Sequence, residues 1–166
     1  MRNAVLWSVL GVILAIANGA IIGKEQILTE GETMLLQLAP RDPRSLMQGD
    51  YMTLNYRIAT EVAGKSQSVT DDGHIVVALD EHRVTRLLRI HDEARALSDG
   101  EYVLRYRKRH RDVRLATNAF YFQEGHADNY RTARYGELRV NDDGDAVLVG
   151  LRDDNFRPLG PGGLHR

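Results

Sequence analysis

The segment Arg105–Arg114, with the sequence RYRKRHRDVR, concentrates positive charge. Six arginine or lysine side chains and one aspartate give it a net charge of +5. Guanidinium groups bind phosphates and carboxylates, so the segment could bind anionic lipid headgroups or an acidic partner protein. The alternative is a hairpin whose arginines are only solvated, while Tyr102, Leu104 and Tyr106 face the core. On the first interpretation the candidate contact residues are Arg105, Arg107, Arg109 and Arg111.

Residues suited to covalent or metal chemistry are few. The chain has no cysteine, which excludes thiol catalysis and cysteine metal sites. Ser45 and Lys65 could form a nucleophile–base pair, but Lys65 lies in a polar segment where its amine stays solvated and charged. The six histidines show no ligand spacing, and a turn capped by Asp128 explains His126 and Asp128 as well as a metal does. We therefore predict no catalytic residue, no metal and no cofactor.

Length and net charge limit the class of partner. The 166 residues suffice for one domain with a hydrophobic core, or for one domain plus an anchor. The formal net charge of −1 gives no general attraction to nucleic acids or to membrane surfaces. Nucleic acid is therefore not a predicted partner.

The segment Ala4–Gly23, AVLWSVLGVILAIANGAIIG, is twenty residues long and carries no formal charge. As a helix it would be about 30 Å long, which matches the hydrocarbon core of a bilayer. It is either a cleavable signal peptide with a processing site at Ala15-Ile16-Ala17, or a retained anchor, since the apolar run continues to Ile22. We favour the anchor; a buried helix of a soluble protein is the remaining alternative.

Positive charges flank the apolar segment on both sides, with Arg2 before it and Lys24 after it. The positive-inside bias is therefore weak. No second apolar span follows in the sequence. We predict a single pass through the inner membrane by residues 4–23, with a short N-terminus inside and the C-terminal domain in the periplasm.

Residues 24–157 follow mostly the two-residue periodicity of β-strands. Paired segments around charged or Asp-Gly turns predict three hairpins, at 74–90, 102–115 and 135–151. We therefore predict one mainly β exported domain after a membrane anchor or signal segment at 1–23. Residues 158–166, rich in glycine and proline, are predicted to be a disordered tail.

The remaining segments of the domain are short. Further strands are expected at 33–38, 50–58 and 120–122, and a flexible loop at 63–72. Helical structure is predicted only for residues 92–97 and for a turn at 128–134.

In the segment QGDYMTLNY, residues 48–56, a Gly-Asp turn precedes an alternating pattern. Met52, Leu54 and Tyr56 fall on the predicted core-facing side of a strand, followed by Ile58. Tyr51 falls on the opposite side. Its ring is either covered by a neighbouring loop, APRDPR at 39–44, or left to contact another protein.

Gly49, Asp50, Tyr51, Leu54 and Tyr56 form a pattern that resembles the signature of the GDYXXLXY family of bacterial proteins. The resemblance extends from Lys24 to Leu159, through the blocks APRDPRSLMQGDY, FYFQEGHADNYRTARYGELRV and GDAVLVGLRD. It implies a membrane-anchored or exported protein, often encoded beside a multi-spanning membrane protein. The resemblance gives the motif residues no role and supplies no catalytic residue.

A more distant resemblance is to type I signal peptidases. SLMQGDYMTL, residues 45–54, is similar to their segment around the nucleophilic serine, and DNYRTARYG, residues 128–136, is similar to a second block, with Gly136 one residue early. The resemblance implies a signal-peptidase-like β fold. The positions of the nucleophile and the general-base lysine hold Arg41 and Thr85, which cannot perform those roles.

Together these observations predict a non-enzymatic, membrane-anchored periplasmic module that binds or supports a multi-spanning membrane protein. The rival hypothesis is a hydrolase on a signal-peptidase-like scaffold with non-standard residues. A domain that binds a small ligand or a polymer of the envelope is the third hypothesis.

Overall fold

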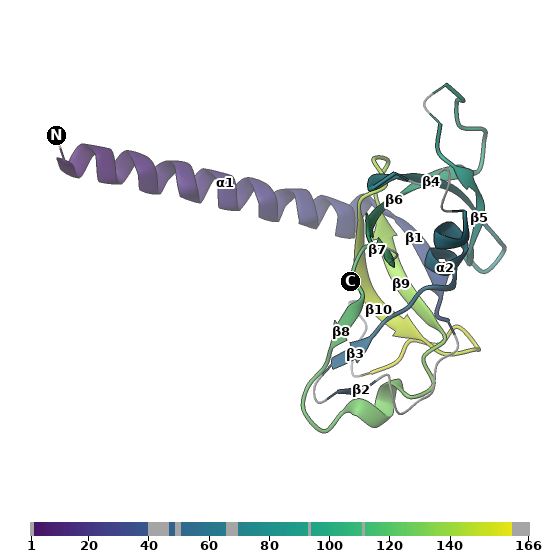
Figure 1. The fold of residues 1–166 in the computed structure, drawn as a ribbon. Helices are drawn as coiled ribbons and strands as arrows, with labels where there is room; N and C mark the ends of the chain where they lie inside the picture. Colours follow the sequence, from purple (N-terminus) through teal and green to yellow (C-terminus); the bar gives the residue numbers. More distant parts are fainter. Residues whose placement is uncertain are drawn as a thin grey trace.

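The computed structural model describes residues 2–39, 47–48, 51–65, 70–92, 94–110 and 112–160. One long helix, α1 (Arg2–Glu30), projects from a β-rich domain (Figure 1). The prediction of a mainly β chain with one N-terminal apolar helix is confirmed. By length and composition α1 could cross a membrane, and most of its described apolar side chains are exposed, with Trp7 at 72% and Ile16 at 69%.

Helix α1 passes directly into strand β1 (Glu32–Gln37) through Gly31. The Gly31 N–H donates to the Ile27 carbonyl at 3.1 Å, and Arg139 donates to the Gly31 carbonyl at 3.0 Å. Ile27 is buried where the helix meets the domain. A Cβ at position 31 would lie 2.4 Å from the Ile27 carbonyl oxygen and 3.1 Å from the backbone of Val140. Only glycine fits this junction without a shift of the backbone.

The first sheet has the antiparallel order β1-β9-β10, with β9 at Tyr135–Val140 and β10 at Ala146–Arg152. The predicted hairpin at 135–151 is confirmed. Its turn contains Gly144 at a φ of +79°, a conformation that glycine adopts without strain. At the open end Glu137 accepts hydrogen bonds from Nε and Nη2 of Arg152, both at 2.8 Å, which raise the pKa of that guanidinium.

The second sheet has the antiparallel order β5-β4-β6-β7. Its strands are β4 (Asp72–Leu79), β5 (Thr85–Ile90), β6 (Glu101–Arg109) and β7 (Asp112–Leu115). The two predicted hairpins at 74–90 and 102–115 are confirmed. Leu104 and Tyr106 of β6 are buried, as predicted.

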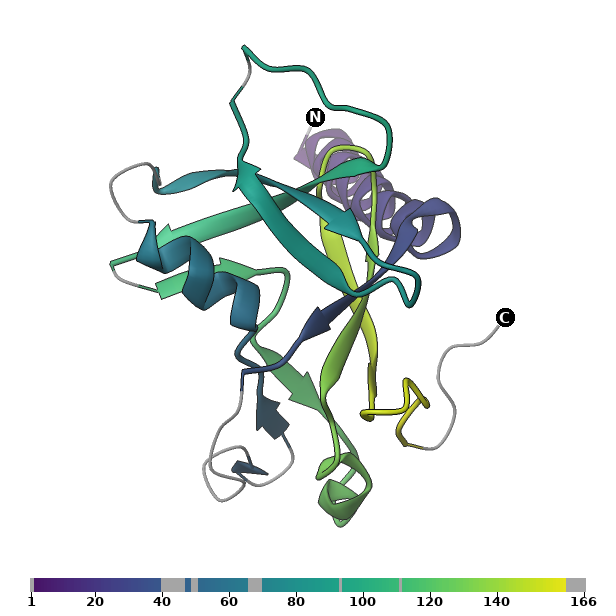
Figure 2. The ribbon, with the colours of Figure 1, turned by 90° about the vertical axis from the view of Figure 1, so that its right-hand side faces the viewer.

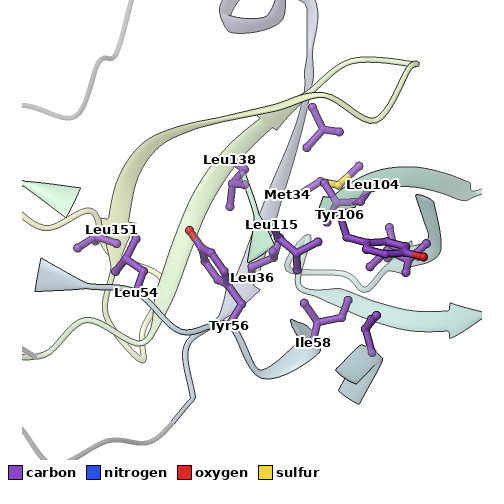
Figure 3. Packing of buried hydrophobic residues seen from close by; sticks show 14 of the residues in the cluster. Met34, Leu36, Leu54, Tyr56, Ile58, Leu104, Tyr106, Leu115, Leu138 and Leu151 are labelled. Atoms are coloured by element: carbon purple, nitrogen blue, oxygen red, sulfur yellow. The ribbon is translucent and has the colours of Figure 1, made fainter. Parts of the chain in front are cut away.

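The two larger sheets enclose one hydrophobic core. At one side the Leu35 N–H donates to the Arg83 carbonyl at 2.9 Å, and at another the Arg105 N–H donates to the Gly144 carbonyl at 2.9 Å. Side chains from both sheets then meet in the interior (Figure 3). The cluster includes Met34, Leu36, Ile75, Val77, Leu104, Tyr106, Leu138 and Leu151.

A third, small sheet projects sideways from the axis of α1 (Figures 1 and 2). Its order is β2-β3-β8, with strands β2 (Met47–Gln48), β3 (Tyr51–Thr53) and β8 (Ala119–Tyr121). The strand predicted at 120–122 is therefore confirmed, with its bounds one residue earlier. We call this sheet the side arm.

The strand predicted from Asp50 to Ile58 is partly wrong. Strand β3 ends at Thr53. A helix, α2 (Arg57–Gly64), contains the end of the predicted strand and the start of the predicted loop at 63–72. Ile58 and Val62 lie one helical turn apart and are both buried, so the helix has its own apolar face. The predicted core side was nevertheless correct, since all four of its residues are buried: Met52, Leu54, Tyr56 and Ile58.

The helix predicted at 92–97 is wrong for the described residues. The Asp92 carboxylate accepts the Ala94 N–H at 3.0 Å, which forms a local turn in place of a helix. The turn predicted at 128–134 is confirmed as the short 3-10 helix η3 (Ala127–Tyr130).

The residues after β10 return to the domain. Pro158 forms a bridge with Arg152, and the Leu159 N–H donates to the Leu151 carbonyl at 2.9 Å. Pro158 and Leu159 therefore pair with β10, although they were predicted to belong to the disordered tail. Residues 161–166 of the predicted tail lie outside the described residues.

Glu101 closes the loop between β5 and β6. Its carboxylate accepts the Ser98 N–H at 3.0 Å and the Arg89 guanidinium at 3.0 Å. These hydrogen bonds, the one from Ser98 first, hold the pKa of Glu101 below its ordinary value. Because the pKa of Glu101 is lower in the folded than in the unfolded protein, its ionised carboxylate stabilises the loop at pH values above the unfolded pKa. This stabilisation is lost as the pH falls through the folded pKa of Glu101.

We therefore expect the amide resonance of Ser98 to titrate with a midpoint below the ordinary glutamate pKa of about 4.3. A pH titration by NMR measures this midpoint. Glu101→Gln should abolish the transition, because the amide of glutamine does not ionise in this range. A transition that persists in the variant would assign it to another carboxylate.

Candidate functional site

Leu54 and Tyr56 of the GDYMTLNY stretch are core residues, with exposed fractions of 2% and 3%. The Tyr56 ring lies over Gly136 of β9, where a Cβ would come within 2.9 Å of a ring carbon (Figure 3). The Tyr56 hydroxyl is buried without a hydrogen-bond partner among the described residues, and burial raises its pKa above the ordinary value. Both side chains therefore serve packing. Gly49 and Asp50 lie outside the described residues.

Tyr51 lies on the opposite face of β3, as the alternation predicts, and is half-buried. It pairs directly across the side arm with Tyr121 of β8, and the two ring centroids are 5.7 Å apart. Tyr121 is 74% exposed. Tyr121 was not among the contact residues predicted from the sequence, although its position between the inward-facing Phe120 and Phe122 was the available signal. The loop 39–44, proposed to cover Tyr51, lies outside the described residues apart from Ala39.

The arginines of β6 and β7 line a shallow hollow of about 420 Å³ beside the end of α1. Among the described residues that line it, six are charged: Lys24, Arg105, Arg107, Arg109, Arg114 and Asp145. Five are cations and one is a carboxylate. We call this region the basic hollow. The predicted contact residue Arg111 lies outside the described residues.

Strand geometry explains why these arginines gather. Alternate residues of β6 point to one face, so Arg105, Arg107 and Arg109 share the side opposite to the buried Leu104 and Tyr106. The β6–β7 register places Arg114 directly opposite Arg107. Like charges at directly opposed positions destabilise a sheet.

Carboxylates neutralise the basic hollow only in part. Arg105 pairs with Asp145 at 3.2 Å, while Asp72 lies 3.8 Å from Arg107 and 4.0 Å from Arg109. These side chains are about half exposed, and such pairs contribute little stability. The side chains of Lys24 and Arg114 make no hydrogen bond or ion pair within the described part of the chain.

A second hollow, of about 240 Å³, lies between α2 and β7. Its lining is mixed, with Leu54, Ala59 and Val113 beside Asn55 and Arg114. The side-chain amide nitrogen of Asn55 is buried there without a partner among the described residues. The two hollows are neighbours, because Arg114 lines both.

The structure does not assemble the peptidase-like positions into a described site. Thr85 begins β5, and its hydroxyl is buried without a partner among the residues described. Arg41 and Ser45 lie outside those residues, so neither the Arg41–Thr85 nor the Ser45–Lys65 arrangement is tested. Lys65 is exposed just after α2, as expected for a solvated amine.

Metal ligands do not converge in the described residues, which contain no group of three or more histidine, cysteine, aspartate or glutamate side chains. Asp128 pairs with Arg131 at 2.8 Å. The fold brings two distant histidines together, since the His74 and His91 rings lie 6.3 Å apart at right angles. No third ligand side chain joins these two rings among the described residues.

The family model for GDYXXLXY proteins matches residues 13–151 of the chain. The chain belongs to the GDYXXLXY family. The match begins within α1 and covers α2 and all three sheets as far as Leu151 in β10.

Comparisons of this GDYXXLXY protein with curated proteins and with solved structures find no match. The suspected family is thus confirmed, while the more distant resemblance to type I signal peptidases is not shown.

Proposed function

We propose that the protein is a non-enzymatic, membrane-anchored module that binds a multi-spanning membrane protein, with its β domain in the periplasm. The observation that carries this proposal is the exposed apolar helix α1, joined to the β domain by the single residue Gly31. An exposed apolar helix of this length is stable in a bilayer but costly in water. The domain is thereby held at the membrane surface, where membrane proteins are its nearest partners.

The side arm is the contact surface that we assign to the partner. It projects sideways from the axis of α1 (Figures 1 and 2). With α1 across the bilayer, the side arm would therefore lie roughly parallel to the membrane plane. Its face carries the Tyr51–Tyr121 pair, and Tyr121 is the most exposed large hydrophobic side chain of the described domain. Tyrosine is enriched at the centres of protein interfaces, because its ring buries a large area and its hydroxyl still forms hydrogen bonds.

Tyr121→Ala tests this assignment. Because the side chain is 74% exposed, the free energy of unfolding should change by less than about 0.5 kcal/mol. Co-purification of the multi-spanning membrane protein encoded beside the gene, from membranes dissolved in mild detergent, should weaken at least about tenfold. Leu97→Ala is the matched control, because Leu97 is also exposed, at 43%, but lies on the loop between β5 and β6.

Equal loss of the partner in Tyr121→Ala and Leu97→Ala would contradict the role of the side arm. Failure of the wild-type chain to retain any membrane protein, together with normal behaviour of the neighbouring gene product in its absence, would contradict the proposed function itself.

A further inference from the structure

We propose that the basic hollow binds the phosphate of an anionic phospholipid headgroup, in the leaflet beside the C-terminal end of the apolar segment of α1. This inference rests on the membrane anchorage proposed above. It adds a lipid ligand that the binding of a protein partner does not require.

The position of the basic hollow beside the apolar segment of α1 favours a lipid ligand. Lys24 directly follows the uncharged segment Ala4–Gly23, so its ammonium group lies at the level where hydrocarbon gives way to headgroups. The same Lys24 lines the basic hollow together with the arginines of β6 and β7. Figure 1 shows both strands beside the place where α1 meets the domain. Burial of Ile27 and the hydrogen bond from Arg139 to Gly31 hold the helix and the sheet together there.

The charge of the basic hollow favours an anionic ligand. Arg107 and Arg114 face each other across β6 and β7, and Arg105 and Arg109 flank them on the same face. These guanidinium groups repel one another unless an anion lies between them. The nearest carboxylates leave Arg114 and Lys24 without a partner in the described residues. A phosphate offers several acceptor oxygens and can bridge such groups through paired hydrogen bonds.

The size of the basic hollow favours a small ligand. A hollow of about 420 Å³ is within the range of small-ligand sites, and it suits a headgroup better than a folded acidic partner. It is open and polar, as a site for a ligand that remains attached to the bilayer must be. Clusters of cations next to a membrane span are attracted to anionic lipid headgroups.

The test uses the full chain in a non-ionic detergent, titrated with dioctanoyl-phosphatidylglycerol and, separately, with dioctanoyl-phosphatidylcholine. Native mass spectrometry counts the bound lipid. The variant is Arg107→Gln with Arg114→Gln, and the matched control is Arg57→Gln with Arg131→Gln. The control arginines are also exposed, at 62% and 70%, and do not line the basic hollow. Two further titrations use glycerol phosphate and inorganic phosphate in place of the lipids.

We expect wild type to bind phosphatidylglycerol in preference to phosphatidylcholine. The Arg107→Gln, Arg114→Gln variant should weaken phosphatidylglycerol binding at least about tenfold, while the control binds as wild type does. Without lipid the variant should melt no lower than wild type, because it removes a pair of opposed like charges. This melting point shows that loss of binding is not loss of folding.

Equal binding of both lipids, or wild-type binding by the variant, would overturn the headgroup site. Binding of glycerol phosphate or inorganic phosphate as tight as that of phosphatidylglycerol would overturn the lipid assignment in favour of a free phosphate. If the same arginines retain an acidic protein and show no lipid preference, the lipid assignment would be overturned in favour of a protein ligand. Anchorage is tested separately: release of the chain from membranes by alkaline carbonate contradicts the proposed function, whereas retention without lipid preference contradicts only the site.

Discussion

Tyr56→Ala is expected to lower the free energy of unfolding by about 3–5 kcal/mol, the usual cost of removing a buried aromatic ring. The ring is 3% exposed and covers Gly136, which has no side chain to fill the space left behind. Urea denaturation of the full chain in non-ionic detergent, followed by far-ultraviolet circular dichroism, measures the change.

Tyr56→Phe is the matched control for this prediction. It keeps the ring and removes a hydroxyl that has no hydrogen-bond partner among the described residues, so stability should be unchanged or slightly higher. A Tyr56→Ala protein as stable as wild type would show that the packing over Gly136 is unimportant. The last residue of the family motif would then have to be explained by a contact outside the chain.

Gly31→Val should destabilise the junction between α1 and β1 by about 1–3 kcal/mol, the usual cost of overpacking a tight site. A Cβ there would lie 2.4 Å from the Ile27 carbonyl oxygen, which belongs to the backbone and cannot rotate away. The Gly31–Ile27 hydrogen bond should break, and the helix should then vary in its angle to the sheets. Gly23→Val is the matched control, because a Cβ at Gly23 meets nothing within 4 Å.

Distances between two spin labels measure this change in angle. The chain has no cysteine, so Gln26→Cys on α1 and Asp142→Cys in the β9–β10 turn can be labelled selectively; both residues are exposed. The distance distribution should broaden in Gly31→Val and stay narrow in Gly23→Val. A narrow distribution in both would mean that the junction tolerates a side chain.

The hairpins were predictable because strand alternation and turn chemistry are local. The Asp-Gly step at Asp143 and Gly144 specifies a turn whatever the rest of the chain does. Helix α2 was missed because Ile58 fits both the two-residue period of a strand and the 3.6-residue period of a helix. It continues the alternation from Met52 and also begins the helical pair with Val62. The burial of Ile58 was therefore predicted correctly while its secondary structure was not.

The basic hollow could be predicted only in part. Alternation in β6 indicated that its arginines share an outward face, but no local pattern links them to Lys24, which precedes β1. The opposition of Arg107 and Arg114 depends on the register of the hairpin, and Tyr51 meets Tyr121 only through pairing of distant strands. Such long-range pairing is set by the whole fold, so the sequence showed the components of these surfaces without their juxtaposition.

In the proposed membrane-anchored complex, the single-residue connection between α1 and β1 would determine how the domain meets its partner. A long tether would let the domain sample many heights and rotations, and each encounter would have to select a productive one. With a stiff connection, lateral diffusion in the bilayer becomes a two-dimensional search in which every collision presents the same surface. The orientational entropy lost on complex formation is then small, so even a modest contact area suffices for stable association.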